Sequence, residues 1–134
     1  MNRNDFRALA RLRLREARAL RDRSLWSGCY YLSGHAVECA LKACIARSTK
    51  RYDFPEKKRV QDSHTHDLGA LLKLAGLAAT LPRDATAHPT IGLNWSVVKD
   101  WSVETRYNQS VTAQTALDLY RAAAGVISWL RQYW

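Results

Sequence analysis

The longest regular pattern of apolar positions in this chain lies between Ser24 and Arg47, in the stretch SLWSGCYYLSGHAVECALKACIAR. Its apolar residues recur at steps of three and four, the period of one face of an α-helix. Small and apolar residues flank that face, so most of the circumference is apolar. Because such a helix must be covered on several sides, we predict that residues 24–48 form the central helix of a bundle.

The same periodicity predicts four further helices around the central one. They are expected at residues 5–23, 68–79, 91–101 and 110–134. Asn4 or Asp5 is a suitable N-cap for the first of them. Polar or proline-containing segments at 49–66, 83–88 and 102–109 are expected to form the connections. No alternating strand pattern is present, so the predicted fold is one all-α domain over residues 1–134, an up-and-down helical bundle of four long helices plus one short helix.

Composition limits the class of protein. Hydrophobic residues make up 47% of the 134 residues, which favours a folded domain over a disordered chain. No apolar run approaches the roughly 18 residues needed to cross a bilayer, and the arginine-rich start lacks the apolar segment of a signal peptide. Three cysteines, an odd number, do not suit a disulfide framework. We therefore expect a cytoplasmic protein with reduced thiols and no membrane contact.

Positive charge is concentrated near the start of the chain. The formal net charge is +9, and residues 3–23 contain eight arginines but three carboxylates, which leaves +5 in this segment. One flank of the first predicted helix carries a row of arginines, the arginine stripe: Arg7, Arg11, Arg15 and Arg18. The stripe is either a solvated helix face or a surface that contacts phosphates. The shortage of carboxylates favours a polyanionic partner, with nucleic acid first.

Histidines and cysteines form only partial motifs. His35 and Cys39 are four residues apart on one face of the central helix, and His64 and His66 lie in a predicted loop that can fold over them. These residue types bind zinc, but no paired CxxC or HExxH spacing is present. A cysteine in a buried helix is commonly just a small hydrophobic residue. We therefore expect no metal site, no cysteine nucleophile and no cofactor.

Three segments together resemble a known family. The central helix contains YYLSGHAVECALKACIA, HTHDLGALLKLAG supplies His66-Asp67-Leu68, and WSVETRY supplies Arg106-Tyr107. In this order and spacing they resemble the HEPN domain (higher eukaryotes and prokaryotes nucleotide-binding), particularly its small stand-alone prokaryotic members. The resemblance covers most of the chain. It implies an up-and-down helical bundle, usually a homodimer, often encoded beside a minimal nucleotidyltransferase in toxin–antitoxin or defence modules.

The resemblance also implies a catalytic motif that this chain changes. Many HEPN domains are metal-independent ribonucleases with an R-x4–6-H motif at the start of a late helix. Arginine holds the phosphate charge, and histidine can transfer a proton near neutral pH. The arginine that matches by position is Arg106, but residues 111–113, where the histidine would fall, are Val, Thr and Ala. Strong catalysis of the family type is therefore not expected.

The same spacing occurs at two other places. Arg83 and His88 match it in RDATAH, and Arg59 matches it with both His64 and His66. A chain with this many arginines is expected to contain such matches by chance. Arg83 with His88 is the better catalytic pair because a polar residue follows the arginine, as the resemblance to HEPN motifs implies, although flanking prolines predict a loop there.

These observations leave three functional hypotheses. The first is an RNA- or nucleotide-binding component of a two-gene module, without strong catalysis, in which Arg106, Tyr107 and the arginine stripe bind the ligand. The alternative is a metal-independent ribonuclease toxin that uses Arg83 and His88. In a third, the protein is an assembly module whose tryptophans form a dimer face, although tryptophans are more often core residues.

Overall fold

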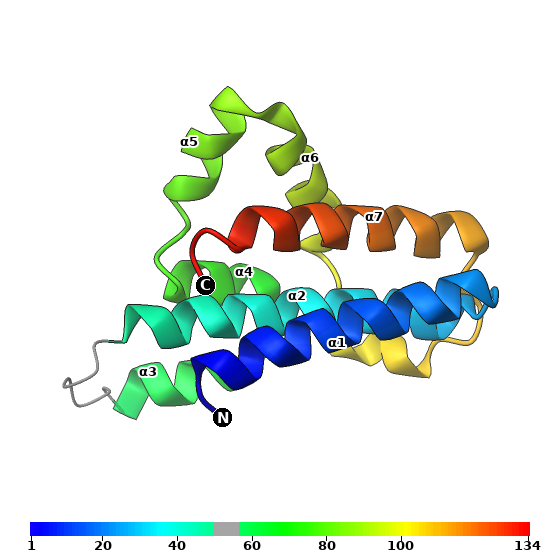
Figure 1. Cartoon of the computed structure of the whole chain (residues 1–134), viewed down its shortest axis with the longest axis horizontal. Helices are drawn as coiled ribbons and strands as arrows, with labels where there is room; N and C mark the ends of the chain where they lie inside the picture. Colours follow the sequence, from blue (N-terminus) through cyan, green and yellow to red (C-terminus); the bar gives the residue numbers. More distant parts are fainter. Residues whose placement is uncertain (50–56) are drawn as a thin grey trace.

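The computed structural model describes residues 1–49 and 57–134, and all regular elements in those residues are helical. Three long helices, α1 (Arg3–Asp22), α2 (Trp26–Ser48) and α7 (Ala113–Leu130), run along the long axis of the molecule (Figure 1). The predicted all-α class is confirmed. The predicted number of helices is not confirmed, because the described part of the chain between α2 and α7 forms several short helices.

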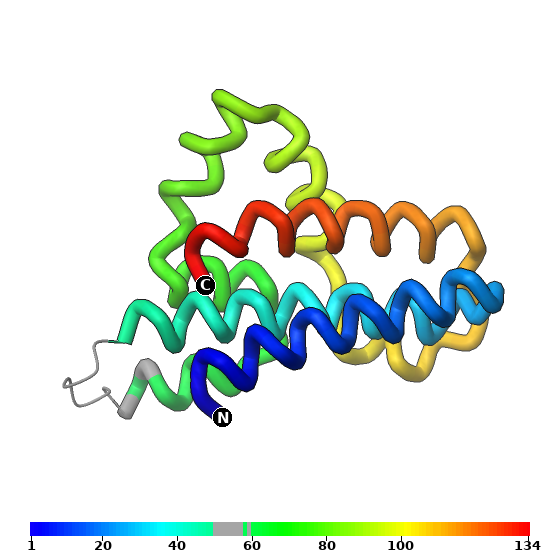
Figure 2. The backbone as a smooth tube through the Cα atoms, in the orientation of Figure 1, coloured from blue at the N-terminus to red at the C-terminus, as the bar shows by residue number. Residues whose placement is uncertain are grey.

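These shorter elements are α3 (Lys57–Asp62), α4 (Leu68–Leu74), α5 (Thr80–Ala87), α6 (Pro89–Val98) and the 3-10 helix η1 (Val103–Tyr107). The helix α4 and η1 pack against α2. The helix α6 packs against α7, and α5 packs against α6. The tube in Figure 2 shows α5 and α6 as an arm that projects beyond α7, while η1 lies below α2 in the same view. Part of the loop predicted at 49–66, namely residues 50–56, lies outside the described residues.

The helix α2 lies at the centre of the bundle, as its pattern predicts. It contacts α1, α4, α7 and η1, and 12 of its 23 residues are buried. Gly34 permits the close approach of Trp101, from the segment between α6 and η1, because a Cβ atom at this position would overlap the Trp101 ring. Within the described residues, no helix is both long and apolar enough to cross a membrane.

Three of the tryptophans belong to this core. The exposed fractions of Trp101, Trp129 and Trp134 are 4%, 5% and 3%, so these side chains are covered within one chain. Trp95 is partly buried and packs against the same core. These four side chains therefore do not form an exposed dimer face.

Helix ends differ from the prediction for identifiable reasons. The helix α4 ends at Leu74 instead of residue 79, because Gly76 adopts a φ of +75°. The Gly76 and Leu77 amides then donate to the carbonyl groups of Lys73 and Leu72, at 2.9 and 3.1 Å. This is the Schellman arrangement that closes many helices.

The segment predicted as a loop at 83–88 is mostly helical. Pro82 lies in the first turn of α5, where the absence of an amide hydrogen leaves no intrahelical bond unmade. Pro89 occupies the first position of α6, for which its fixed φ is suited. The prolines therefore begin two short helices and do not bracket a loop.

N-caps fix the starts of the first and last helices. Asn2, not Asn4 or Asp5, caps α1, and the Asp5 side chain accepts a bond from the Asn2 amide to complete a capping box. Thr112 caps α7 by accepting from the Thr115 amide at 3.2 Å, which moves the start of this helix to residue 113.

Candidate functional site

Arg106 and Tyr107 form an exposed pair on η1. The guanidinium carbon of Arg106 lies 4.8 Å from the centre of the Tyr107 ring, and 68% of Tyr107 is exposed. The interaction with Tyr107 raises the pKa of Arg106, so its charge is permanent. Within the described part of the chain, no carboxylate forms an ion pair with Arg106. The pair therefore combines a cation that forms no ion pair with an accessible aromatic ring.

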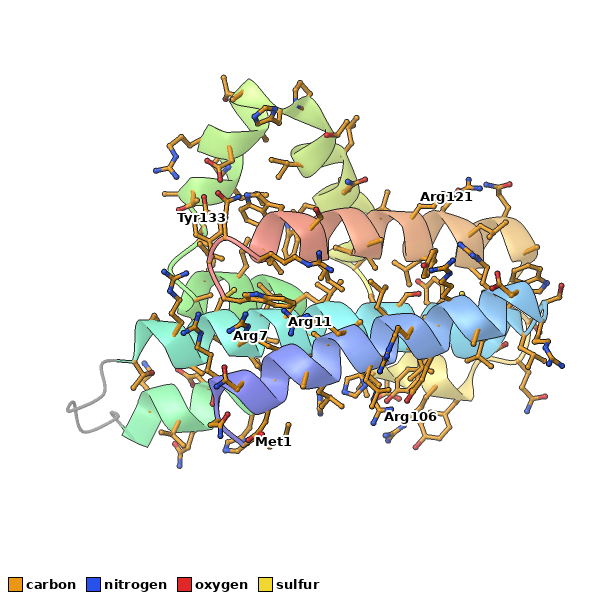
Figure 3. The ribbon with its side chains drawn as sticks, in the orientation of Figure 1. Met1, Arg7, Arg11, Arg106, Arg121 and Tyr133 are labelled. Atoms are coloured by element: carbon orange, nitrogen blue, oxygen red, sulfur yellow. The ribbon has the colours of Figure 1, made fainter. Side chains whose placement is uncertain are left out.

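The arginine stripe divides into two halves. The guanidinium groups of Arg7 and Arg11 lie 5.7 and 4.9 Å from the ring centre of Trp134, on the side of α1 that faces α7 (Figure 3). Since Trp134 is only 3% exposed, these two arginines cover a core residue. Arg15 and Arg18 are exposed and form no ion pair in the described residues. Only this second half is free to bind phosphates without uncovering the core.

Arg83 and His88 lie on the projecting arm, Arg83 within α5 and His88 between α5 and α6. Both are exposed, and Figure 1 shows α5 far from η1, so this pair does not converge with Arg106. The Arg83 guanidinium binds the adjacent Asp84 carboxylate at 3.2 Å. No hydrogen bond or ion pair joins Arg83 to His88.

Asp84 has a structural role that the sequence does not indicate. Its Oδ2 atom accepts hydrogen bonds from the hydroxyl group of Tyr133 and from Nε1 of Trp129, the latter at 2.9 Å. These bonds, with Tyr133 the larger contributor, lower the pKa of Asp84. Because α5 has no buried residue of its own, these bonds of Asp84 attach α5 to the end of α7.

A polar row interrupts the apolar surface of α2 on the side of η1. It consists of Tyr31, His35, Glu38 and Lys42, which recur at helical spacing. Glu38 is 3% exposed, and its Oε1 atom accepts bonds from Lys42 Nζ and His66 Nδ1, each at 2.9 Å. The sequence predicts the Lys42 contact from its spacing, but the His66 contact spans 28 residues and has no local signal.

Burial controls the chemistry of the neighbouring groups. It lowers the pKa of His35, against the opposing influence of Glu38, and it raises the pKa of Cys39 to about 12. His35 is therefore a neutral imidazole and Cys39 a neutral thiol at physiological pH. His66, the loop histidine closest to them, is bound to Glu38. Among residues 1–49 and 57–134, no three His, Cys, Asp or Glu side chains are grouped closely enough to hold a metal ion.

A cavity of about 420 Å³ lies beside this polar row. It is lined by Thr65, His66, Asp67, Leu68, Lys99, Asp100, Trp101, Ser102 and Val103. Nε1 of the lining residue Trp101 is buried without a hydrogen-bond partner, as is Oε2 of Glu38, which binds the lining residue His66. Most buried polar atoms are paired, and the two other unpaired ones in the described residues are the Nε atoms of Arg3 and Arg7.

Comparisons with known proteins do not identify the chain: no protein-family model, no curated protein and no solved structure matches it. The resemblance to HEPN domains consequently depends on the three sequence segments alone.

Proposed function

We propose that this protein binds single-stranded RNA or a nucleotide through Arg106 and Tyr107, without strong catalysis, and that Arg15 and Arg18 extend the positive surface. The observation that supports it most directly is the exposed Arg106–Tyr107 pair, in which Arg106 forms no ion pair with a described residue. A guanidinium group forms charge-assisted bonds with phosphate, and an accessible tyrosine ring can stack on a base. The net charge of +9 favours a polyanionic ligand.

Two features of the site support binding over cleavage. Thr112, at a position where the family motif requires histidine, is occupied as the N-cap of α7. Arg83 of the alternative motif binds Asp84, which attaches α5 to α7. A proton-transfer group must reach the scissile phosphate, and neither motif supplies a histidine beside Arg106. His66 lies near η1 but belongs to neither motif, and Glu38 holds it through Nδ1.

The test is a titration of a labelled single-stranded RNA with wild-type protein and two matched variants. Arg106→Ala should weaken binding about 10- to 150-fold, which corresponds to about 1.5–3 kcal/mol for a hydrogen bond to a charged group. Arg121→Ala is the control, because Arg121 is also exposed but lies on the far side of α7 from Arg106 (Figure 3). Equal losses in both variants would mean that only diffuse charge is involved.

The ribonuclease alternative has its own assay. RNA cleavage is measured in the presence of EDTA for the wild type, His88→Ala and His64→Ala. We expect no robust cleavage. Cleavage that is lost only in His88→Ala would replace the binding function by the ribonuclease toxin.

The resemblance adds two partners to the proposal, a second copy of this chain and a minimal nucleotidyltransferase. Co-expression with the product of an adjacent open reading frame, followed by size-exclusion chromatography, tests the second. A separate elution of the two products would remove the nucleotidyltransferase from the proposal.

A further inference from the structure

The cavity beside Glu38 has the size and the lining of a ligand site. Its volume of about 420 Å³ falls within the usual range for small-molecule sites, about 300–1,000 Å³. Its polar side chains include the hydroxyl groups of Thr65 and Ser102 and the charged groups of Asp67, Asp100 and Lys99. Thr65, Asp67 and Ser102 each accept a backbone amide hydrogen. The hydroxyl hydrogens of Thr65 and Ser102 and the second oxygen of Asp67 remain for a ligand, together with Lys99 and Asp100.

The charges of the lining disfavour a phosphate inside the cavity. Two carboxylates, Asp67 and Asp100, outnumber the one ammonium group of Lys99. The buried carboxylate of Glu38 behind His66 is paired with Lys42, so this pair adds no net positive charge. A neutral group rich in hydroxyls fits this environment better, and carboxylates are known to bind ribose hydroxyls in nucleotide sites.

His66 is held in a defined orientation at the wall of this cavity. Its Nδ1 atom contacts Oε1 of Glu38 at 2.9 Å, and the same oxygen accepts a bond from Lys42. Because a carboxylate accepts and does not donate, the neutral imidazole must carry its hydrogen on Nδ1. The Nε2 atom is then a hydrogen-bond acceptor. It forms no bond to any described residue, and 53% of the His66 side chain is exposed.

The cavity is also adjacent to the proposed phosphate site. Val103 lines the cavity and begins η1, and Arg106 follows three residues later in the same helix. Three residues of 3-10 helix advance the chain by about 6 Å. A sugar in the cavity and a phosphate at Arg106 can therefore belong to one nucleotide or to neighbouring nucleotides.

We propose that this cavity takes a ribose of single-stranded RNA and that Nε2 of His66 accepts a hydrogen bond from its 2′-hydroxyl group. His66 is then the residue by which the protein distinguishes RNA from DNA, since the 2′-hydroxyl group is the feature that differs between the two sugars. This inference rests on the proposed binding function and adds the sugar that is recognised.

The experiment compares three labelled oligomers of uridine, each of about twelve nucleotides, with ribose, 2′-deoxyribose or 2′-fluoro sugars. The wild type should bind the ribose oligomer about 2- to 13-fold more tightly than the deoxyribose oligomer, the ratio expected from one neutral hydrogen bond. The 2′-fluoro oligomer should bind like the deoxyribose oligomer, because fluorine cannot donate to Nε2. These three titrations need no variant, so they do not depend on the folding of a mutant.

A matched pair of variants assigns the effect to one histidine. His66→Phe keeps a ring of similar size, and it should reduce the affinity for the ribose oligomer to that for the deoxyribose oligomer, which itself should not change. His64→Phe, at an exposed histidine that does not line the cavity, should leave the ratio unchanged.

The outcomes separate this inference from the function on which it rests. Equal affinity of the wild type for the three oligomers would overturn the ribose site and leave RNA binding intact. A ratio that persists in His66→Phe would likewise overturn the role of His66. If the wild type binds none of the oligomers, both the binding function and the ribose site are wrong.

Discussion

Substitution of the two halves of the arginine stripe should change two different properties. Loss of Arg7 and Arg11 should lower stability, and loss of Arg15 and Arg18 should lower the salt dependence of RNA binding. Arg7 and Arg11 stack on Trp134, whereas Arg15 and Arg18 point into solvent without an ion pair in the described residues. Replacement of each pair by glutamine removes two charges in both cases. The double variant of the first pair also uncovers a core tryptophan, and the double variant of the second does not.

Of the two double variants, only Arg7→Gln/Arg11→Gln should be less stable than the wild type. A cation–π contact contributes about 0.5–1 kcal/mol when exposed and about 2 kcal/mol when desolvated, and the Arg7 contact is partly buried. Loss of both contacts should therefore lower the free energy of unfolding by about 2 kcal/mol. For a chain of this length, this corresponds to a decrease in Tm of roughly 6–10 °C. The Arg15→Gln/Arg18→Gln variant should stay within about 0.5 kcal/mol of the wild type, as is usual for surface substitutions.

The salt dependence of RNA binding should instead change in the Arg15→Gln/Arg18→Gln variant. Each phosphate contact with a single strand contributes about 0.7 to the slope of log affinity against log salt concentration. The Arg15→Gln/Arg18→Gln variant should consequently flatten the slope by about 1.4 with no change in Tm. Thermal unfolding and RNA titrations at several salt concentrations measure both quantities on the same samples. An unchanged slope would show that Arg15 and Arg18 form a solvated face, and an unchanged Tm in the other variant would refute the role of Trp134.

Three further predictions follow from the packing. Gly34→Ala should lower the free energy of unfolding by about 2 kcal/mol, since overpacking of about 3 kcal/mol exceeds the gain in helix propensity of about 1 kcal/mol. Gly69→Ala, where the nearest atom would be 3.4 Å away, should not destabilise the protein by urea unfolding. Burial raises the pKa of Cys39 and Cys44 to about 12, and an unfolded thiol ionises near pH 9. Above pH 9 the unfolded state loses these protons and the folded state keeps them, so urea unfolding should show a loss of about 1.4 kcal/mol per pH unit for each thiol, and alanine at both positions should remove these two contributions. Sedimentation should give about twice 15.3 kDa for a homodimer, and Leu93→Asp, at a residue that is 65% exposed on α6, should favour the monomer; a wild-type monomer would contradict this prediction.

The fold was predictable where a periodic apolar pattern is long. Both ends of the central helix α2 were predicted to within two residues, because its apolar residues follow the helical period over its whole length. The short helices were harder, since their ends depend on single residues. Gly76 ends α4 through its positive φ, and Pro82 is as compatible with the first turn of a helix as with a loop. Such positions have two local solutions, and tertiary packing selects one.

The candidate site was predictable only in part. Arg106 and Tyr107 were found through a motif, and the structure shows that both are exposed. The contact of Arg7 with Trp134 joins opposite ends of the sequence, so no local pattern can indicate it. The contact of Glu38 with His66 is similar, because α2 and the segment before α4 meet only in the folded chain.

The buried position of Glu38 is not explained by stability. Removal of a carboxylate from water costs several kcal/mol, and its attraction to Lys42 and His66 offsets only part of that cost. Replacement of a buried ion pair by apolar residues of similar volume is often neutral or stabilising, so an apolar residue would serve the core at least as well. One oxygen of Glu38 even lacks a hydrogen-bond partner. What an apolar residue cannot do is hold the hydrogen of His66 on Nδ1 and leave Nε2 as an acceptor at the wall of the cavity. The carboxylate is therefore better explained by the orientation of His66 than by the strength of the core.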